Sequence, residues 1–143
     1  MKQSVKDKVK GIVEAIDGLT FEYNDIFRAN VKFDDIKFPV CLFLLPETGM
    51  TTVKNGIMRD NPDCVFAFCE MCDLDPEGEE IDVIFEQLKG FSYKFIDAVN
   101  KSGLFKPVAE NIPYFQEITK MDACVAWHAI RVKLEEIQGE CFR

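Results

Sequence analysis

Two cysteines separated by two residues, Cys69 and Cys72, are the most chemically suggestive feature of this sequence. A Cys-x-x-Cys pair is typical of thiol oxidoreductases, in which a helix N-terminus lowers the pKa of one thiol. Here the pair follows an apolar, strand-like run, but the acidic segment 73–78 separates it from the next predicted helix. Because negative charge near a thiol raises its pKa, the sequence favours a structural role. A thiol oxidoreductase using Cys69 and Cys72 stays as an alternative function.

The other residue types that bind metals or act as nucleophiles are scattered. Zinc usually takes two paired sets of ligands, whereas the chain has one Cys-x-x-Cys and a single histidine, His128. Segment 73–78 is similar to the start of a calcium loop, but Ile84 stands where a bidentate glutamate is needed. On a strand, Cys124 and His128 would be about 13 Å apart, beyond hydrogen-bonding reach. We expect no catalytic residue, no cofactor and no metal site.

Composition indicates one acidic domain over residues 1–143. The hydrophobic fraction of 48% is enough for one core in a chain of this length. The formal net charge of −8 opposes binding to nucleic acid or anionic lipid, since both need clustered Lys and Arg. No signal peptide and no membrane-spanning run is recognisable. We expect a protein that no signal peptide sends for secretion, without direct sequence-specific contact with nucleic acid, without membrane contact, and with reduced cysteines.

Two segments have the periodicity of amphipathic helices. Residues 4–17 place apolar side chains at helical spacing, and Gly18 follows as a residue that can end the helix. Residues 79–102 form a longer apolar stripe, with Gly103 at its end. The stripe consists of Ile81, Ile84, Phe85, Leu88, Phe91, Phe95, Ile96 and Val99. Gly90 in the middle of this helix suggests close packing against a neighbouring element.

Apolar runs and alternating patterns predict several strands between these helices. The predicted strands cover residues 19–23, 29–33, 38–45 and 64–72, with a weaker, polar strand or loop over 51–59. The turn-forming residues 61–63 separate the weaker segment from the strand after it.

The last part of the chain contains one extended segment and one ambiguous segment. Residues 105–119 include Pro107 and Pro113 and read as an edge strand. Residues 123–137 alternate as a strand does, with a helix as the alternative. The order of helix, strands, long helix and two strands predicts an α+β fold. In this fold a mostly antiparallel sheet packs against an N-terminal helix and one long central helix.

This element order resembles that of the tail-terminator and tail-completion (neck) proteins of long-tailed phages and prophages. In that family an N-terminal helix precedes a set of strands, a central helix follows, and a final strand pair completes the sheet. The matching stretches here are 5–16, 38–45, 64–72, 81–99 and 121–137. The resemblance is one of pattern and carries no residue motif. It implies a structural subunit of the host cytoplasm or of the virion that forms a ring, commonly hexameric, and that contacts other tail or neck proteins.

Under this resemblance, the polar segment 49–63 is a candidate for contact with other subunits or with the tail tube, because such excursions rarely serve the core. The residues singled out within it are Met50, Thr52, Lys54, Ile57 and Arg59. An ordinary hairpin is the alternative interpretation of this segment. The alternative for the whole protein is a small monomeric binding, adaptor or inhibitor domain with one exposed apolar patch.

Overall fold

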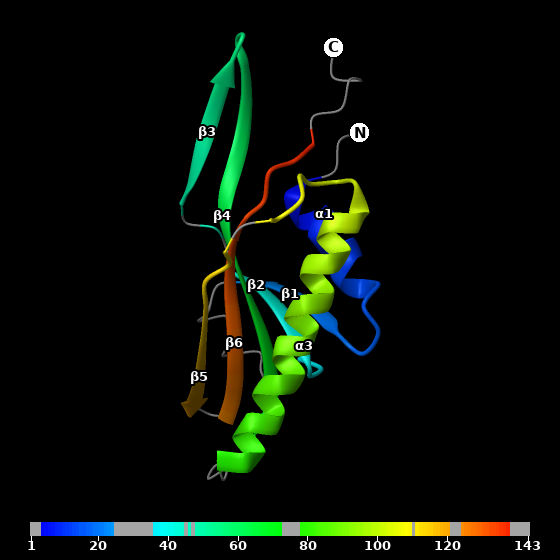
Figure 1. Cartoon of the computed structure of the whole chain (residues 1–143), viewed down its shortest axis with the longest axis vertical. Coiled ribbons are helices and arrows are strands. Elements are labelled where there is room, and N and C mark those ends of the chain that lie inside the picture. The colour runs from blue at the N-terminus through cyan, green and yellow to red at the C-terminus, as the bar shows by residue number, and fades with distance from the viewer. Residues whose placement is uncertain are drawn as a thin grey trace.

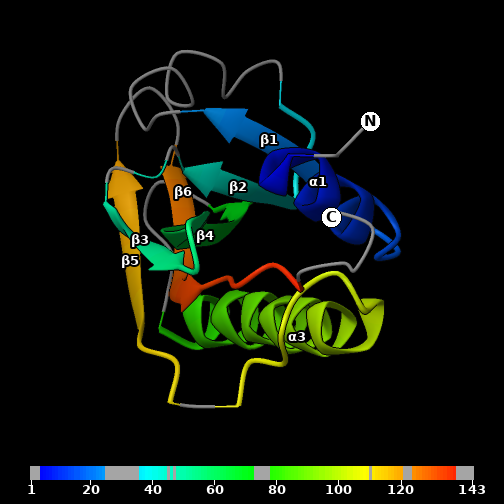
Figure 2. The ribbon, with the colours of Figure 1, turned by 90° about the horizontal axis from the view of Figure 1, so that it is seen from above.

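The computed structural model describes residues 4–24, 36–44, 46, 48–72, 78–109, 111–120 and 124–137. In chain order the elements are α1 (Val5–Glu14), β1 (Thr20–Asn24), β2 (Val40–Leu44), β3 (Gly49–Lys54), β4 (Ile57–Met71), α3 (Gly78–Ser102), β5 (Tyr114–Lys120) and β6 (Cys124–Lys133). α1 and α3 pack on the same side of one sheet (Figures 1 and 2). The predicted α+β class is therefore confirmed, with an N-terminal helix and a long central helix.

The main sheet has the strand order β1-β2-β4-β6-β5. The β1–β2 pair is parallel, whereas β2–β4, β4–β6 and β6–β5 are antiparallel. β3 lies off this path and pairs with the first part of β4. The mostly antiparallel sheet matches the prediction, and β5 lies at an edge of the sheet, immediately after Pro113.

Alternation along β4 sends side chains to two separate apolar clusters. Phe66 lies in the cluster that faces the helices, whereas Ala67 and Cys69 lie in a smaller cluster on the opposite face. Phe66 packs between Phe43 of β2 and Phe95 of α3, with ring centroids 4.6 Å and 4.7 Å apart. Such aromatic pairs contribute about 1 kcal/mol beyond the burial of their area. These rings fix the long helix against the centre of the sheet.

α3 ends at Ser102 and is followed by Gly103, as the sequence predicts, whereas α1 ends at Glu14, three residues before its predicted end, and Gly18 lies beyond its C-cap residue Ala15. Gly18 and Gly103 have φ angles of 81° and 73°, the left-handed conformation that glycine adopts without strain. At the start of α1, the Ser4 hydroxyl accepts a hydrogen bond from the Asp7 N–H at 3.2 Å. The expected close packing at Gly90 is wrong, because a Cβ added there would meet nothing within 4 Å.

Most predicted strands are present with shifted ends. Segments 19–23 and 38–45 correspond to β1 and β2, and segment 123–137 contains β6, so its helical alternative is wrong. Only the second half of segment 105–119 is a regular strand, β5. The predicted strand over 29–33 lies outside the described residues.

β4 is the main difference from the predicted strands. The sequence suggests a break at residues 61–63, whereas β4 continues through them to Met71. Proline has no N–H to donate, so a strand tolerates it only where the ladder needs no donor. Pro62 lies opposite Gly49 of β3, and the next residue, Asp63, already lies opposite Lys133 of β6. Pro62 thus occupies the point where β4 changes partners.

Candidate interaction surface

β3 and the first part of β4 form a two-stranded hairpin that extends beyond the main sheet (Figure 1). Six cross-strand residue pairs hold the hairpin together. Its turn is Asn55-Gly56, with φ angles of 53° and 77°. Two positive φ angles in a two-residue loop match the right-handed twist of the flanking strands, and Asn-Gly is the preferred sequence for such a turn. This dipeptide is the signal that could have turned the weak prediction for 51–59 into a hairpin.

The strand register gathers most of the predicted interface residues on one face of the hairpin. Side chains alternate along a strand, and directly opposed residues point to the same side. Lys54 lies opposite Ile57, and Met50 and Thr52 follow at alternate positions along β3. These four residues therefore share a face. Arg59 is the register partner of Thr52.

Apolar side chains of the hairpin are exposed on both of its faces. Val53 and Met58 lie opposite each other on the second face, with 62% and 74% of their surface exposed. On the first face, Met50 and Ile57 are also more than half exposed. Surface apolar residues scattered singly are ordinary, whereas a contiguous group indicates a contact surface. The outer edge of β3 pairs with no other described strand, so it can accept a further strand.

The two arms of the hairpin are held together at its base. The Asp63 N–H donates to the carbonyl of Thr48 at 2.9 Å, and the Thr48 hydroxyl donates to the Asp63 carboxylate at 3.4 Å. A Cβ added at Gly49 would lie 2.9 Å from the Cα of Pro62. The two strands therefore approach closely where the hairpin leaves the main sheet. The direction of the hairpin is set by this junction.

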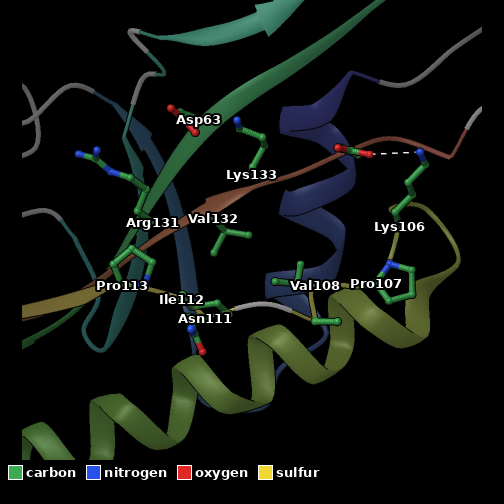
Figure 3. A pocket seen from close by; sticks show the side chains of 12 residues that line it. Asp63, Lys106, Pro107, Val108, Asn111, Ile112, Pro113, Arg131, Val132 and Lys133 are labelled. Atoms are coloured by element: carbon green, nitrogen blue, oxygen red, sulfur yellow. Dashed lines mark ion pairs between the residues drawn. The ribbon is translucent and has the colours of Figure 1, made fainter. Parts of the chain in front are cut away.

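A cavity of about 480 Å³ lies beside the same junction (Figure 3). It is bounded by Asp63, by the C-terminal end of β6 and by residues 106–109 and 111–113. Charged side chains of both signs line it, and the Lys106 ammonium pairs with the Glu135 carboxylate at 3.2 Å. None of its lining residues is a serine, threonine, cysteine, histidine or tyrosine. The nucleophilic groups that it does hold are lysine and carboxylate side chains, and Lys106 is already paired with Glu135.

The structure does not bring Cys69 and Cys72 together. Residues three apart on a strand point to opposite faces, so Cys69 lies in the smaller cluster and Cys72 packs on the helix side. Burial raises the pKa of Cys69 well above its ordinary value, and the charges of Cys41 and Glu70 add to the effect. A dithiol couple needs adjacent sulfurs and an accessible thiolate. The acidic residues 73–77 and the calcium-like loop lie outside the described residues.

His128 is a buried residue with a partner on each side of its ring. Its Nδ1 lies 2.9 Å from Oε1 of Gln116, and the ring stacks on Tyr114 with centroids 4.9 Å apart. Burial, and then the positive charge of Lys89, lowers the pKa of His128. The described residues contain no group of three or more His, Cys, Asp or Glu side chains that could hold a metal ion. His128 therefore contacts two residues of the edge strand β5, Gln116 and Tyr114.

Comparison with protein-family models and with curated proteins gives no match to this chain. Among the described residues, no helix has both the length and the apolar character to cross a membrane. The β3–β4 hairpin and the surfaces around it are therefore the features of the molecule that bear on its function.

Proposed function

We propose that this protein is a structural subunit of a phage or prophage tail or neck, of the tail-terminator or tail-completion type. It assembles into a ring through the β3–β4 hairpin and contacts other tail or neck proteins in the host cytoplasm or in the virion. The observation that carries the proposal is the hairpin itself, which projects from the sheet with four apolar side chains more than half exposed. The element order supports the same class of protein.

The hairpin is poorly explained as part of a monomer. A two-stranded hairpin without a packed face is at best marginally stable in water. Burying the exposed parts of its four apolar side chains contributes roughly 5 kcal/mol. Association of two proteins costs about that much or more in lost freedom of motion. A lasting contact therefore needs both faces of the hairpin, or its backbone edge as well, and these are the parts that a neighbouring subunit would cover.

The edge strand β5 offers a surface for the hairpin of the next subunit. The outer edge of β5 pairs with no described strand. On this strand Tyr114 and Phe115 are each more than half exposed, one on each face. A hairpin from one copy that meets β5 of another forms a heterologous contact, and such contacts generate a ring when the rotation from copy to copy closes. The net charge of −8 suits a ring through which DNA passes without adhering.

The test is the molar mass in solution over a range of protein concentrations, measured by light scattering or sedimentation. We expect a concentration-dependent oligomer that electron microscopy shows as rings. The double substitution V53E/M58E places negative charge on the hairpin. It should reduce the molar mass in solution to that of a monomer. The matched control is Val83→Glu on α3, an equally exposed valine outside the hairpin, which should keep the oligomer.

A monomer at every concentration would contradict ring assembly. That result would favour the alternative, a small binding, adaptor or inhibitor domain whose hairpin contacts a different protein. Oligomers that persist in the V53E/M58E variant would instead locate the assembly contact elsewhere. The thiol oxidoreductase alternative has no comparable support, because Cys69 and Cys72 lie on opposite faces of the sheet.

A further inference from the structure

Cys72 and Cys124 lie directly opposite each other where β4 ends and β6 begins. In the antiparallel register Met71 pairs with Val125, and the two cysteines continue this register by one residue. The Cys72 N–H donates to the carbonyl of Cys124 at 3.0 Å. The two Sγ atoms are 2.7 Å apart. A disulfide bond is about 2.05 Å long, so a small side-chain movement brings the sulfurs to bonding distance.

The remaining described cysteines are enclosed by apolar side chains. Cys41 and Cys64 are fully buried in the helix-side cluster, and Cys69 is fully buried in the smaller cluster. Cys72 is half-buried, and its neighbour Cys124 is buried. Among these five described cysteines, Cys72 is therefore the one that is not fully buried. Reactive cysteines are partly exposed, whereas enclosed cysteines are inert.

We propose that Cys72 and Cys124 are a redox-active pair, which a small-molecule disulfide such as glutathione disulfide converts into a reversible cross-link between β4 and β6. The proposal goes beyond assembly and does not depend on it, because the hairpin lies at the other end of β4. It also differs from the pairing that the Cys-x-x-Cys motif suggests, since Cys69 takes no part.

Thiol–disulfide exchange between the protein and glutathione disulfide proceeds in two steps. The Cys72 thiolate attacks one sulfur of glutathione disulfide, which forms a mixed disulfide and releases one glutathione thiolate. Cys124 then loses its proton and attacks the Cys72 sulfur, and the second glutathione leaves as a thiolate. The two protein thiols are oxidised by two electrons, and glutathione disulfide is reduced to two glutathione thiols that take up the two protons.

The cross-link would close a long loop of the chain. The segment between Cys72 and Cys124 contains α3 and β5. Closing a loop of this length restricts the unfolded chain and should raise the melting temperature by roughly 10 °C. The link would fasten one end of the main sheet, on the side where α3 begins.

The experiment uses the full chain in glutathione buffers of increasing oxidised fraction. Samples are quenched with an alkylating reagent, digested without reduction and analysed by mass spectrometry. We expect one linked peptide pair, Cys72 to Cys124, that dithiothreitol removes, together with the rise in melting temperature. Cys72→Ser and Cys124→Ser should each abolish the link and the rise, whereas the matched control Cys69→Ser should keep both.

If a variant fails to fold, the cross-linked peptides found in the unmodified chain decide whether the proposal holds. A link between Cys69 and Cys72, a link from either proposed partner to Cys141, or free alkylation of Cys72 in fully oxidised buffer would each overturn the proposal. Loss of the Cys72–Cys124 link in the Cys69→Ser variant would overturn it as well. None of these outcomes affects the molar-mass test of the hairpin, so the two proposals fail separately.

Discussion

The two parts of β4 run in one continuous strand but have opposite surroundings. From Val65 to Cys69 the strand lies between β2 and β6, and its side chains lie in the apolar clusters on the two faces of the sheet. From Ile57 to Met58 the same strand pairs only with β3 and exposes apolar side chains on both faces. The hydrophobic residues of the two parts of β4 therefore serve two purposes. In the sheet they stabilise the fold, and in the hairpin they are available for a partner.

The largest expected effect is on stability and distinguishes the two parts directly. Phe66→Ala removes a buried ring between β2 and α3 and should lower the free energy of unfolding by about 4 kcal/mol. Met58→Ala, in the hairpin, should change it by less than about 0.5 kcal/mol, as exposed positions usually do. Urea unfolding of the two variants as monomers measures both values. Similar losses would mean that the hairpin packs on the core in solution.

The second largest loss of stability should come from a substitution at the junction between the two parts of β4. Gly49→Ala forces a Cβ against the backbone of Pro62 and should cost about 2 kcal/mol through local overpacking. Gly78→Ala is the control, because a Cβ there meets nothing within 4 Å. Thermal unfolding of both variants gives the comparison. An unchanged melting temperature for Gly49→Ala would show that the junction is loose.

The main sheet should also respond to pH through His128. Its pKa in the folded chain is lowered, first by burial and then by Lys89, so the unfolded chain binds the proton more tightly. Stability is therefore complete above the ordinary histidine pKa of about 6.5 and falls as the pH drops below it, by at most about 1.4 kcal/mol per pH unit. His128→Gln should lose less stability than the natural chain between pH 7.5 and 5.5 in urea unfolding. Equal losses would assign the pH dependence to carboxylates.

The smallest effect should be a gain in stability on the long helix. Gly90→Ala adds a methyl group where nothing lies within 4 Å and reduces the freedom of the unfolded chain. We expect a gain of about 0.5 to 1 kcal/mol in the free energy of unfolding, with the oligomer unchanged. A loss of stability in urea unfolding would mean that another element approaches this face of α3.

The sequence predicts those elements whose signals are local. The apolar stripe of α3, the glycines at 18 and 103, and the alternation in β6 each indicate structure within a few residues. The length of β4 could not be predicted in this way, because Pro62 acts as a break unless one knows that the strand changes partners there.

The candidate sites depend more strongly on contacts between distant residues. The Cys-x-x-Cys spacing draws attention to Cys69 and Cys72, yet a strand separates residues three apart. The partner of Cys72 is Cys124, which β6 brings beside it from across α3. The polar segment 49–63, which the sequence predicts as a contact surface, is recognisable from its polarity as an excursion from the core. That four of its residues share one face of the hairpin becomes clear only from the strand register, which the Asn55-Gly56 turn sets.

The most direct test of the central claim, that the hairpin is the assembly contact, is amide hydrogen exchange at increasing protein concentration. Residues 49–62 should become protected as the oligomer forms, while the protection of β4 beyond Cys64 and of β6 stays constant. The V53E/M58E variant should show no such gain. Oligomers whose hairpin amides exchange as fast as those of the monomer would contradict the account.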